Sequence, residues 1–130
     1  MKHIHFDTES DGFYGAYWEC RGGSDCTVIA MLGDDPEDYM ARSAVKWLLR
    51  LGVNVLTMSP AKKDYSHHNY PLECIEKAIA WLKSHGSAKI GIAGASTTGT
   101  LALTAASIFD DISLTVAMTP SDFVWQGFMQ

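Results

Sequence analysis

The feature that most constrains the fold is an alternation of short apolar segments with longer amphipathic ones, which begins near Gly33. The short segments are typical of buried strands. They are Val53–Met58, Lys89–Ala93 and Ile112–Met118. The apolar residues of the longer segments recur at helical spacing. This alternation predicts a mainly parallel sheet with helices on both faces and right-handed crossovers.

The residues before Gly33 follow a different rhythm. His3–Phe6, Phe13–Cys20 and Cys26–Leu32 are short strand-like segments, separated by an Asp-Gly turn and a glycine-rich turn. We therefore predict that the chain opens as an antiparallel meander. Together with the alternating part, this gives one α/β domain over residues 1–130, with six strands.

The amphipathic segments carry helix boundary signals. In the first, Asp35 is an N-cap candidate and Pro36 would occupy the first helical position, while Gly52 stands where a left-handed C-terminal cap is expected. The other two predicted helices run from Pro71 to about Gly86 and from about Gly99 to about Asp110, and in the last of them Leu101, Ala105 and Ile108 share one face.

In an open parallel sheet, ligands bind beyond the carboxyl ends of the strands. Residues that carry chemistry are therefore expected in the loops that follow the predicted strands, rather than at their starts. The loops concerned are Gly33–Asp35, Ser59–Asn69, Ala95–Thr98 and Thr119–Asp122.

One of these loops has the context of a nucleophile elbow. The strand that begins at Lys89 runs into Gly94–Gly99, with the sequence Gly-Ala-Ser-Thr-Thr-Gly, and a helix follows. In an elbow, a serine stands at a sharp strand-to-helix turn between small residues, and the helix N-terminus faces the developing oxyanion. The alternative is that Ser96 only caps the helix, as serines commonly do.

These residues resemble the α/β-hydrolase fold. The segments 89–99 (KIGIAGASTTG) and 117–121 (AMTPS) are most similar to the branch that holds acyl-CoA thioester hydrolases and the C-terminal domain of bile acid-CoA:amino acid N-acyltransferases. The resemblance covers nearly the whole chain, but only as the first half of that fold, ending after the sixth strand. It implies a small acyl ester or thioester substrate and an acyl-serine intermediate.

By this resemblance Ser96 is the nucleophile and the backbone N–H of Thr97 is one arm of the oxyanion hole. The second arm is expected after the third strand, at Gly33 or Asp34. The sequence departs from the usual elbow at one position: Thr98 stands two residues after the serine, where the pattern has glycine. A β-branched residue there crowds the tight turn.

Phosphate-binding patterns fit the same turn less well. Gly94 and Gly99 have the spacing of half a phosphate-binding loop, but Thr100 stands where that loop has its lysine. The glycines at 91, 94 and 99 also lack the spacing of the dinucleotide-binding fingerprint. We therefore favour the elbow over a nucleotide site.

The sequence offers few partners for the serine. In this fold the acid and then the histidine follow the nucleophile along the chain, whereas all five histidines precede Ser96. His67 and His68 lie in a loop after a strand, where Asp64 could orient one of them as a base or within a metal cluster; otherwise they are solvated loop residues. Asp122 is the candidate acid, and otherwise a turn residue.

The last predicted strand, Ile112–Met118, has alternating apolar side chains and no lysine, proline or bulge that would blunt a sheet edge. We therefore expect that further strands, the acid and the histidine lie in a missing half, and that residues 1–130 alone are inactive. The alternatives are a carboxylesterase or dienelactone-hydrolase-like enzyme, or an inactive interaction module that pairs with a second copy or a complementing chain through this strand.

Composition narrows the partners and the compartment. The chain is 47% hydrophobic and 19% charged with a net charge of -5, which is typical of a soluble globular protein. Basic residues do not cluster beyond Lys62 and Lys63, so neither nucleic acid nor an acidic membrane surface is an expected partner. Neither a signal-peptide segment nor a membrane span is visible, which favours the cytoplasm.

Cysteine usage agrees with that compartment. Cys20, Cys26 and Cys74 are an odd number without C-x-x-C spacing, so they predict free thiols rather than a disulfide framework or a zinc site. A bond between Cys20 and Cys26 is the alternative under oxidising conditions. We expect no metal or organic cofactor, although an acyl-CoA substrate would bring its own carrier.

Overall fold

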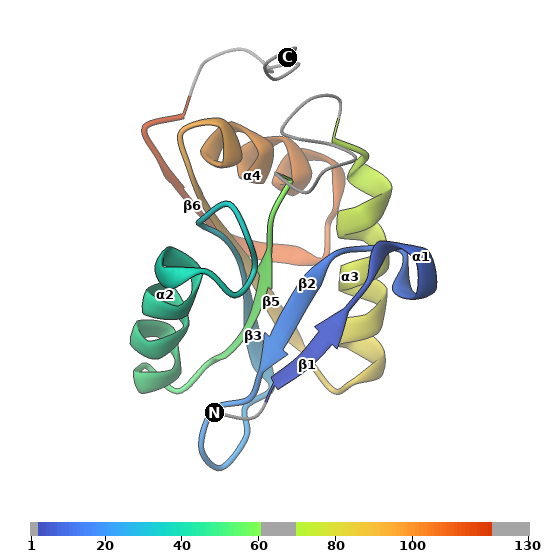
Figure 1. Ribbon diagram of the computed structural model, residues 1–130. Coiled ribbons are helices and arrows are strands. Elements are labelled where there is room, and N and C mark those ends of the chain that lie inside the picture. The colour runs from blue at the N-terminus through green and yellow to red at the C-terminus, as the bar shows by residue number, and fades with distance from the viewer. Residues whose placement is uncertain (1–2, 61–69, 121–130) are drawn as a thin grey trace.

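The computed structural model describes residues 3–60 and 70–120, which form a six-stranded sheet covered by helices on both faces (Figure 1). The strands are β1 (His3–Phe6), β2 (Gly15–Trp18), β3 (Cys26–Met31), β4 (Asn54–Met58), β5 (Lys89–Ala95) and β6 (Ile112–Met118). The helices are α1 (Thr8–Asp11), α2 (Tyr39–Arg50), α3 (Leu72–Ser84) and α4 (Thr97–Ile108).

The strand order is β1-β2-β4-β3-β5-β6. Strands β4, β3, β5 and β6 run parallel, while β1 pairs with β2, and β2 with β4, in antiparallel fashion. The predicted α/β class, with a mainly parallel sheet and an antiparallel N-terminal part, is confirmed.

The third strand departs from the predicted meander. Instead of pairing with β2, β3 lies between β4 and β5, parallel to both. The side chain of Asn54 stabilises the connection from β2 to β3: it accepts the Cys20 N–H at 2.9 Å and donates to the Ser24 carbonyl at 2.8 Å. Asn54, the first residue of β4, thus binds the turn that follows β2. A central place also suits β3, because it is apolar on both faces.

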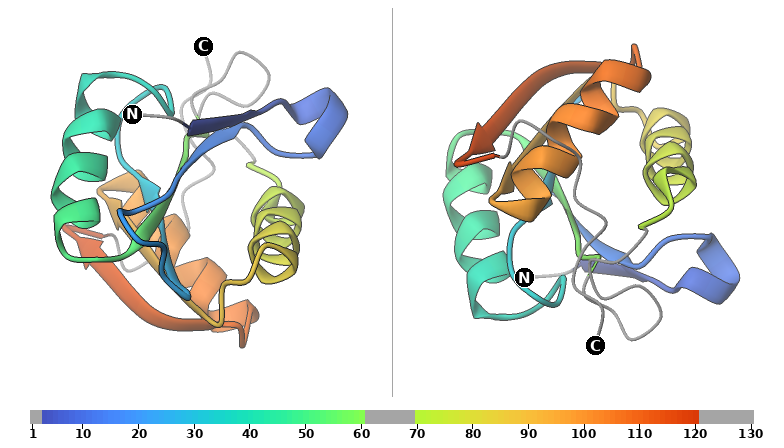
Figure 2. Two further views of the ribbon diagram at one scale, coloured as in Figure 1. Left: turned by 90° about the horizontal axis from the view of Figure 1, so that it is seen from below. Right: turned by 90° about the horizontal axis from the view of Figure 1, so that it is seen from above.

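Alternate residues of β3 enter two separate cores. Ile29 belongs to the larger core, which lies beneath α3 and α4, and its neighbour Ala30 belongs to a smaller core with Trp18 and Val45, beneath α2. Figure 2 shows α2 on one side of the sheet and α3 and α4 on the other. Each fully buried large aliphatic side chain contributes about 1.5–3 kcal/mol through burial.

Helix α2 begins later than predicted. Asp38, not Asp35, is the N-cap: its carboxylate accepts the N–H of Ala41 at 2.8 Å and that of Asp34 at 2.7 Å. The side chain of Asp35 instead accepts the hydroxyl proton of Tyr14, with 2.8 Å between the oxygens. The other carboxylate oxygen of Asp35 accepts the N–H of Glu37 at 2.8 Å, so Asp35 stabilises the turn that precedes α2 rather than the helix itself.

The helix C-termini follow the prediction, and α4 ends at Ile108, close to the expected Asp110. Gly52 and Gly86 have φ values of 81° and 101°, in the left-handed region. Helix α4 begins at Thr97, directly after Ser96, so it starts earlier than the expected Gly99. Its buried face contains Ala105, as predicted, but Ile108 is 54% exposed.

The three cysteines are free, as predicted: Cys20 and Cys74 are buried and Cys26 is half-buried. None of the helices within residues 3–60 and 70–120 is long and apolar enough to cross a bilayer.

Candidate active site

Ser96 occupies a strained turn between β5 and α4. Its φ of 54° and ψ of -120° are unusual for a residue with a side chain, and such backbone costs about 1–3 kcal/mol. Its N–H donates to the carbonyl of Met118 at 2.8 Å, which ties the turn to the end of β6. Its side chain makes no capping hydrogen bond with α4, and the residue is exposed. This is the conformation of an elbow, not that of an ordinary N-cap.

Two glycines make room for this turn. A Cβ atom on Gly94 would lie 2.2 Å from the carbonyl oxygen of Thr98, closer than real Cβ atoms approach. One on Gly99 would lie 3.0 Å from the carbonyl oxygen of Met118. The backbones of β5, α4 and β6 therefore pack so closely around Ser96 that only glycine fits at position 94.

Thr98, the departure from the usual elbow pattern, is accommodated by turning its hydroxyl inward. The N–H of Ala95 donates to Thr98 Oγ1 at 2.9 Å. The same hydroxyl lies 2.7 Å from the carbonyl oxygen of Met31 and 2.8 Å from that of Ala95. The β-branched side chain therefore fits the turn and makes hydrogen bonds that a glycine at this position could not make.

The loop after β3 lies beside the elbow. In the parallel pairing of β3 with β5, Met31, the last residue of β3, is opposite Gly94, so the loop that contains Gly33 starts beside the end of β5. Thr97, the other predicted oxyanion residue, is the first residue of α4. Adjacent strands lie about 4.8 Å apart, so the two predicted arms belong to segments that leave the sheet from neighbouring strands.

The two candidates for the second arm are in different situations. The N–H of Asp34 donates to the carboxylate of Asp38 and is therefore part of the α2 cap. Gly33 has a φ of 94°, and a Cβ there would lie 2.3 Å from the same carboxylate. Ser59, at the end of β4, donates to the Asp34 carbonyl at 2.9 Å. The loop is thus held from two sides, and because the Asp34 N–H is already engaged, Gly33 stays the candidate for the second arm.

Ionisable groups around this loop have shifted pKa values. Burial, the hydrogen bond to Asp35 and nearby acidic charges raise the pKa of Tyr14 to about 12. For Asp38, burial acts to raise the pKa, but the backbone N–H donors, Ala41 first, outweigh it and hold the pKa below its usual value. Sequence reasoning missed both roles. The signal for Asp38 was present, since it lies three residues before Ala41 with the spacing of a cap.

The structure brings no histidine of the described ranges next to Ser96. His3 and His5 lie on β1, which three strands separate from β5, or roughly 20 Å at ordinary strand spacing. His85 caps the C-terminus of α3, before β5 begins, and stacks on Trp81 with 4.5 Å between ring centroids. The candidates His67, His68, Asp64 and Asp122 lie outside the described residues.

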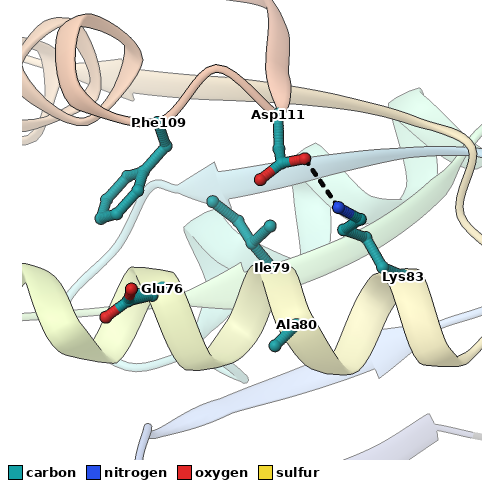
Figure 3. Close-up of a pocket in the computed structure, with 6 residues that line it drawn as sticks. All are labelled: Glu76, Ile79, Ala80, Lys83, Phe109 and Asp111. Atoms are coloured by element: carbon teal, nitrogen blue, oxygen red, sulfur yellow. Dashed lines mark hydrogen bonds and ion pairs between the residues drawn. The ribbon is translucent and has the colours of Figure 1, made fainter.

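A pocket of about 340 Å³ lies away from the elbow, between α3 and the segment that joins α4 to β6. Figure 3 shows Lys83 reaching across it to Asp111, and the two charged groups are 2.9 Å apart. Because Asp111 precedes β6 whereas Ser96 follows β5, and the two strands are parallel, this pocket lies at the opposite end of the strands from Ser96. Across the described part of the chain, no cluster of three or more His, Cys, Asp or Glu residues could hold a metal ion.

Comparison with known proteins bears on the family and the fold. Residues 70–130 match the model of the family described as BAAT / acyl-CoA thioester hydrolase C terminal, so the resemblance predicted from the sequence is confirmed over that segment. No curated protein matches the chain at a significant level.

Several solved structures share the fold. Est1E from Butyrivibrio proteoclasticus is 19% identical with a TM-score of 0.69, and the match covers 92% of this chain and 51% of that one. The esterase Pf2001 from Pyrococcus furiosus is 25% identical with a TM-score of 0.70, over 92% and 51%. The α/β hydrolase GrgF from Penicillium sp. sh18 is 17% identical with a TM-score of 0.67, over 92% and 45%. The chain therefore spans about half the length of these structures.

Proposed function

Because this chain has the α/β-hydrolase fold, we propose that the protein is a serine hydrolase of acyl thioesters or esters, with Ser96 as its nucleophile. One observation carries the proposal: Ser96 is held in a strained, exposed turn whose side chain makes no structural capping bond. Strain of this kind persists where the surrounding structure imposes it, and it clusters at active sites.

In the proposed reaction, Ser96 Oγ attacks the carbonyl carbon of the substrate while a histidine accepts the hydroxyl proton. The tetrahedral oxyanion receives hydrogen bonds from the backbone N–H groups of Thr97 and Gly33. The intermediate then collapses, the bond to the thiol or alcohol breaks, and the histidine returns its proton to that leaving group. Water attacks the acyl-Ser96 ester in the same manner and releases the acid.

We place the histidine and its acid in a further part of the protein, beyond residue 130. This placement is supported by the histidines of β1 and α3, which lie far from Ser96, and by the chain's coverage of about half of each solved relative. His67 and His68 as base, and Asp122 as acid, stay the candidates within the chain.

The substrate class is proposed from the family match, because that family includes acyl-CoA thioester hydrolases. A carboxylesterase is the second candidate, favoured by the name of the Pf2001 esterase. The two activities can be separated with the protein from the complete reading frame. Its rates of hydrolysis are compared between short acyl-CoA thioesters and p-nitrophenyl acetate. Ser96→Ala should abolish both activities, while Ser107→Ala, on the exposed side of α4, should leave them unchanged. Equal rates with and without Ser96 would refute the proposal.

A non-enzymatic alternative rests on the last strand. β6 ends the sheet, and its side chains Leu114, Val116 and Met118 are 63%, 48% and 47% exposed. An open, apolar edge of this kind invites pairing with another strand. We propose that further strands of the same protein cover this edge. If the protein is instead an interaction module, a second copy of the chain or a complementing chain would pair with it.

We also propose the cytoplasm as the compartment, because free thiols fit a reducing environment.

A further inference from the structure

Thr98 makes contacts that the usual glycine at this position cannot make. Its side chain is almost fully buried, at 6% exposure, directly beneath the turn that holds Ser96. A hydroxyl has one proton to donate and two lone pairs to accept with. Thr98 therefore accepts the Ala95 N–H and donates to one carbonyl at a time, with the Met31 oxygen the nearer at 2.7 Å and the Ala95 oxygen at 2.8 Å.

These partners lie on two different strands. Ala95 is the last residue of β5 and immediately precedes Ser96, while Met31 is the last residue of β3 and lies two residues before Gly33. The Thr98 hydroxyl is thus a bridge between the segment that carries the nucleophile and the segment that carries the second oxyanion arm.

The bridge complements the tie on the other side of the turn. The Ser96 N–H donates to the Met118 carbonyl, which fixes the elbow to β6. Thr98 fixes it to β3. A strained residue keeps its conformation only when its surroundings over-determine it, and two ties from opposite sides satisfy that requirement.

We propose that Thr98 is a positioning residue for the reaction: its hydroxyl sets the separation between Ser96 and the Gly33 arm of the oxyanion hole. This inference rests on the proposed function. A misplacement of about 1 Å at a reacting centre can lower the rate on the order of a hundredfold, so losing the bridge should affect the chemical step more than substrate binding.

The test compares Thr98→Val, Thr98→Ser and Thr98→Gly in the protein from the complete reading frame, with p-nitrophenyl acetate as substrate. Valine has the shape of threonine without its hydroxyl, serine restores the hydroxyl, and glycine is the usual elbow residue. We expect kcat to fall about tenfold to a hundredfold in the valine and glycine variants. KM should change less than about twofold, and serine should retain most of the activity.

Thr104→Val is the matched control, because it removes a hydroxyl bond to a backbone carbonyl within α4, away from the elbow. It should leave kcat unchanged. Thermal unfolding of every variant identifies any that fail to fold; if valine does, the glycine and serine variants decide. A glycine variant as active as wild type would overturn the inference while the proposed function stands. Failure of the wild-type protein to form acyl-Ser96 would overturn both.

Discussion

Gly94 is the residue at which the elbow tolerates the least change. A methyl group there would lie 2.2 Å from the carbonyl oxygen of Thr98, so Gly94→Ala must displace either β5 or the first turn of α4. We expect a loss of about 1–3 kcal/mol in the free energy of unfolding, measured by urea denaturation, together with loss of esterase activity.

Gly91→Ala, in the same strand, is the control for Gly94→Ala. Its added methyl group would lie no closer than 3.4 Å to a neighbour, the carbonyl oxygen of Leu114, and Gly91 does not have a positive φ. It should cost much less stability. Equal effects of the two alanines would show that the packing at Gly94 is not specific to the elbow.

Tyr14 gives a prediction about alkaline stability. Its pKa is raised to about 12, first by burial and then by the hydrogen bond to Asp35, so the folded protein holds this proton more tightly than the unfolded chain, in which the pKa is about 10. The contribution to stability is therefore complete below about pH 10 and is lost as the pH rises toward 12.

Chemical denaturation at several alkaline pH values tests this linkage. Tyr14→Phe should show a shallower decline in the free energy of unfolding between about pH 10 and pH 12 than the wild-type protein. Tyr39→Phe, at an exposed position of α2, should decline like wild type. An unchanged slope in Tyr14→Phe would contradict the assignment of the pKa shift.

At the scale of elements, the start of α2 depends on Asp38. Its carboxylate accepts N–H groups from both the helix and the loop after β3, so Asp38→Ala should cost at least the ~1 kcal/mol of an ordinary N-cap and should also loosen the loop at Gly33. Because the folded pKa of Asp38 is lowered, this stability is present above the ordinary pKa and is lost as the pH falls through the folded value.

Urea denaturation at neutral and acidic pH measures the contribution of Asp38. Asp38→Asn should keep most of the cap, and Lys46→Ala, on the exposed side of α2, serves as the control. If Asp38→Ala and Lys46→Ala unfold at the same urea concentration, the carboxylate does not anchor the loop.

Elements with a strong local pattern were predictable from the sequence, whereas those decided by distant contacts were not. The bounds of β6 and the body of α3 follow directly from apolar spacing. The start of α2 does not, since Asp35 and Asp38 are equally good caps locally, and the bond from the Asp34 N–H to Asp38 is not visible in the sequence. The place of β3 likewise depends on its pairing with β4 and β5, which are distant from it in the sequence.

The same division holds for the site. The turn at Ser96 could be predicted because its small neighbours and flanking elements are sequence features. The role of Thr98 could not, because the pattern expects glycine there and the partner Met31 is 67 residues away. The base and acid were not identifiable for a different reason: in this fold they follow the nucleophile, and no histidine follows Ser96 in these 130 residues.

For the whole molecule, we predict that the source gene continues past the codon for Gln130 and encodes a further strand, then an aspartate, then a histidine. In the protein from that complete frame, the β6 amides that point away from β5 should be protected in hydrogen exchange, because added strands would cover the edge. A frame that stops at Gln130, or fast exchange at those amides, would contradict the prediction and turn attention to a partner chain.

The central claim is that Ser96 is an acyl nucleophile, and covalent labelling tests it most directly. The protein from the complete frame is treated with a fluorophosphonate, which modifies activated serines, and the peptide that carries Ser96 is analysed by mass spectrometry. We predict one adduct, on Ser96, that Ser96→Ala abolishes and that Ser107→Ala retains. An unmodified Ser96, or equal labelling of the Ser96→Ala protein, would contradict the account.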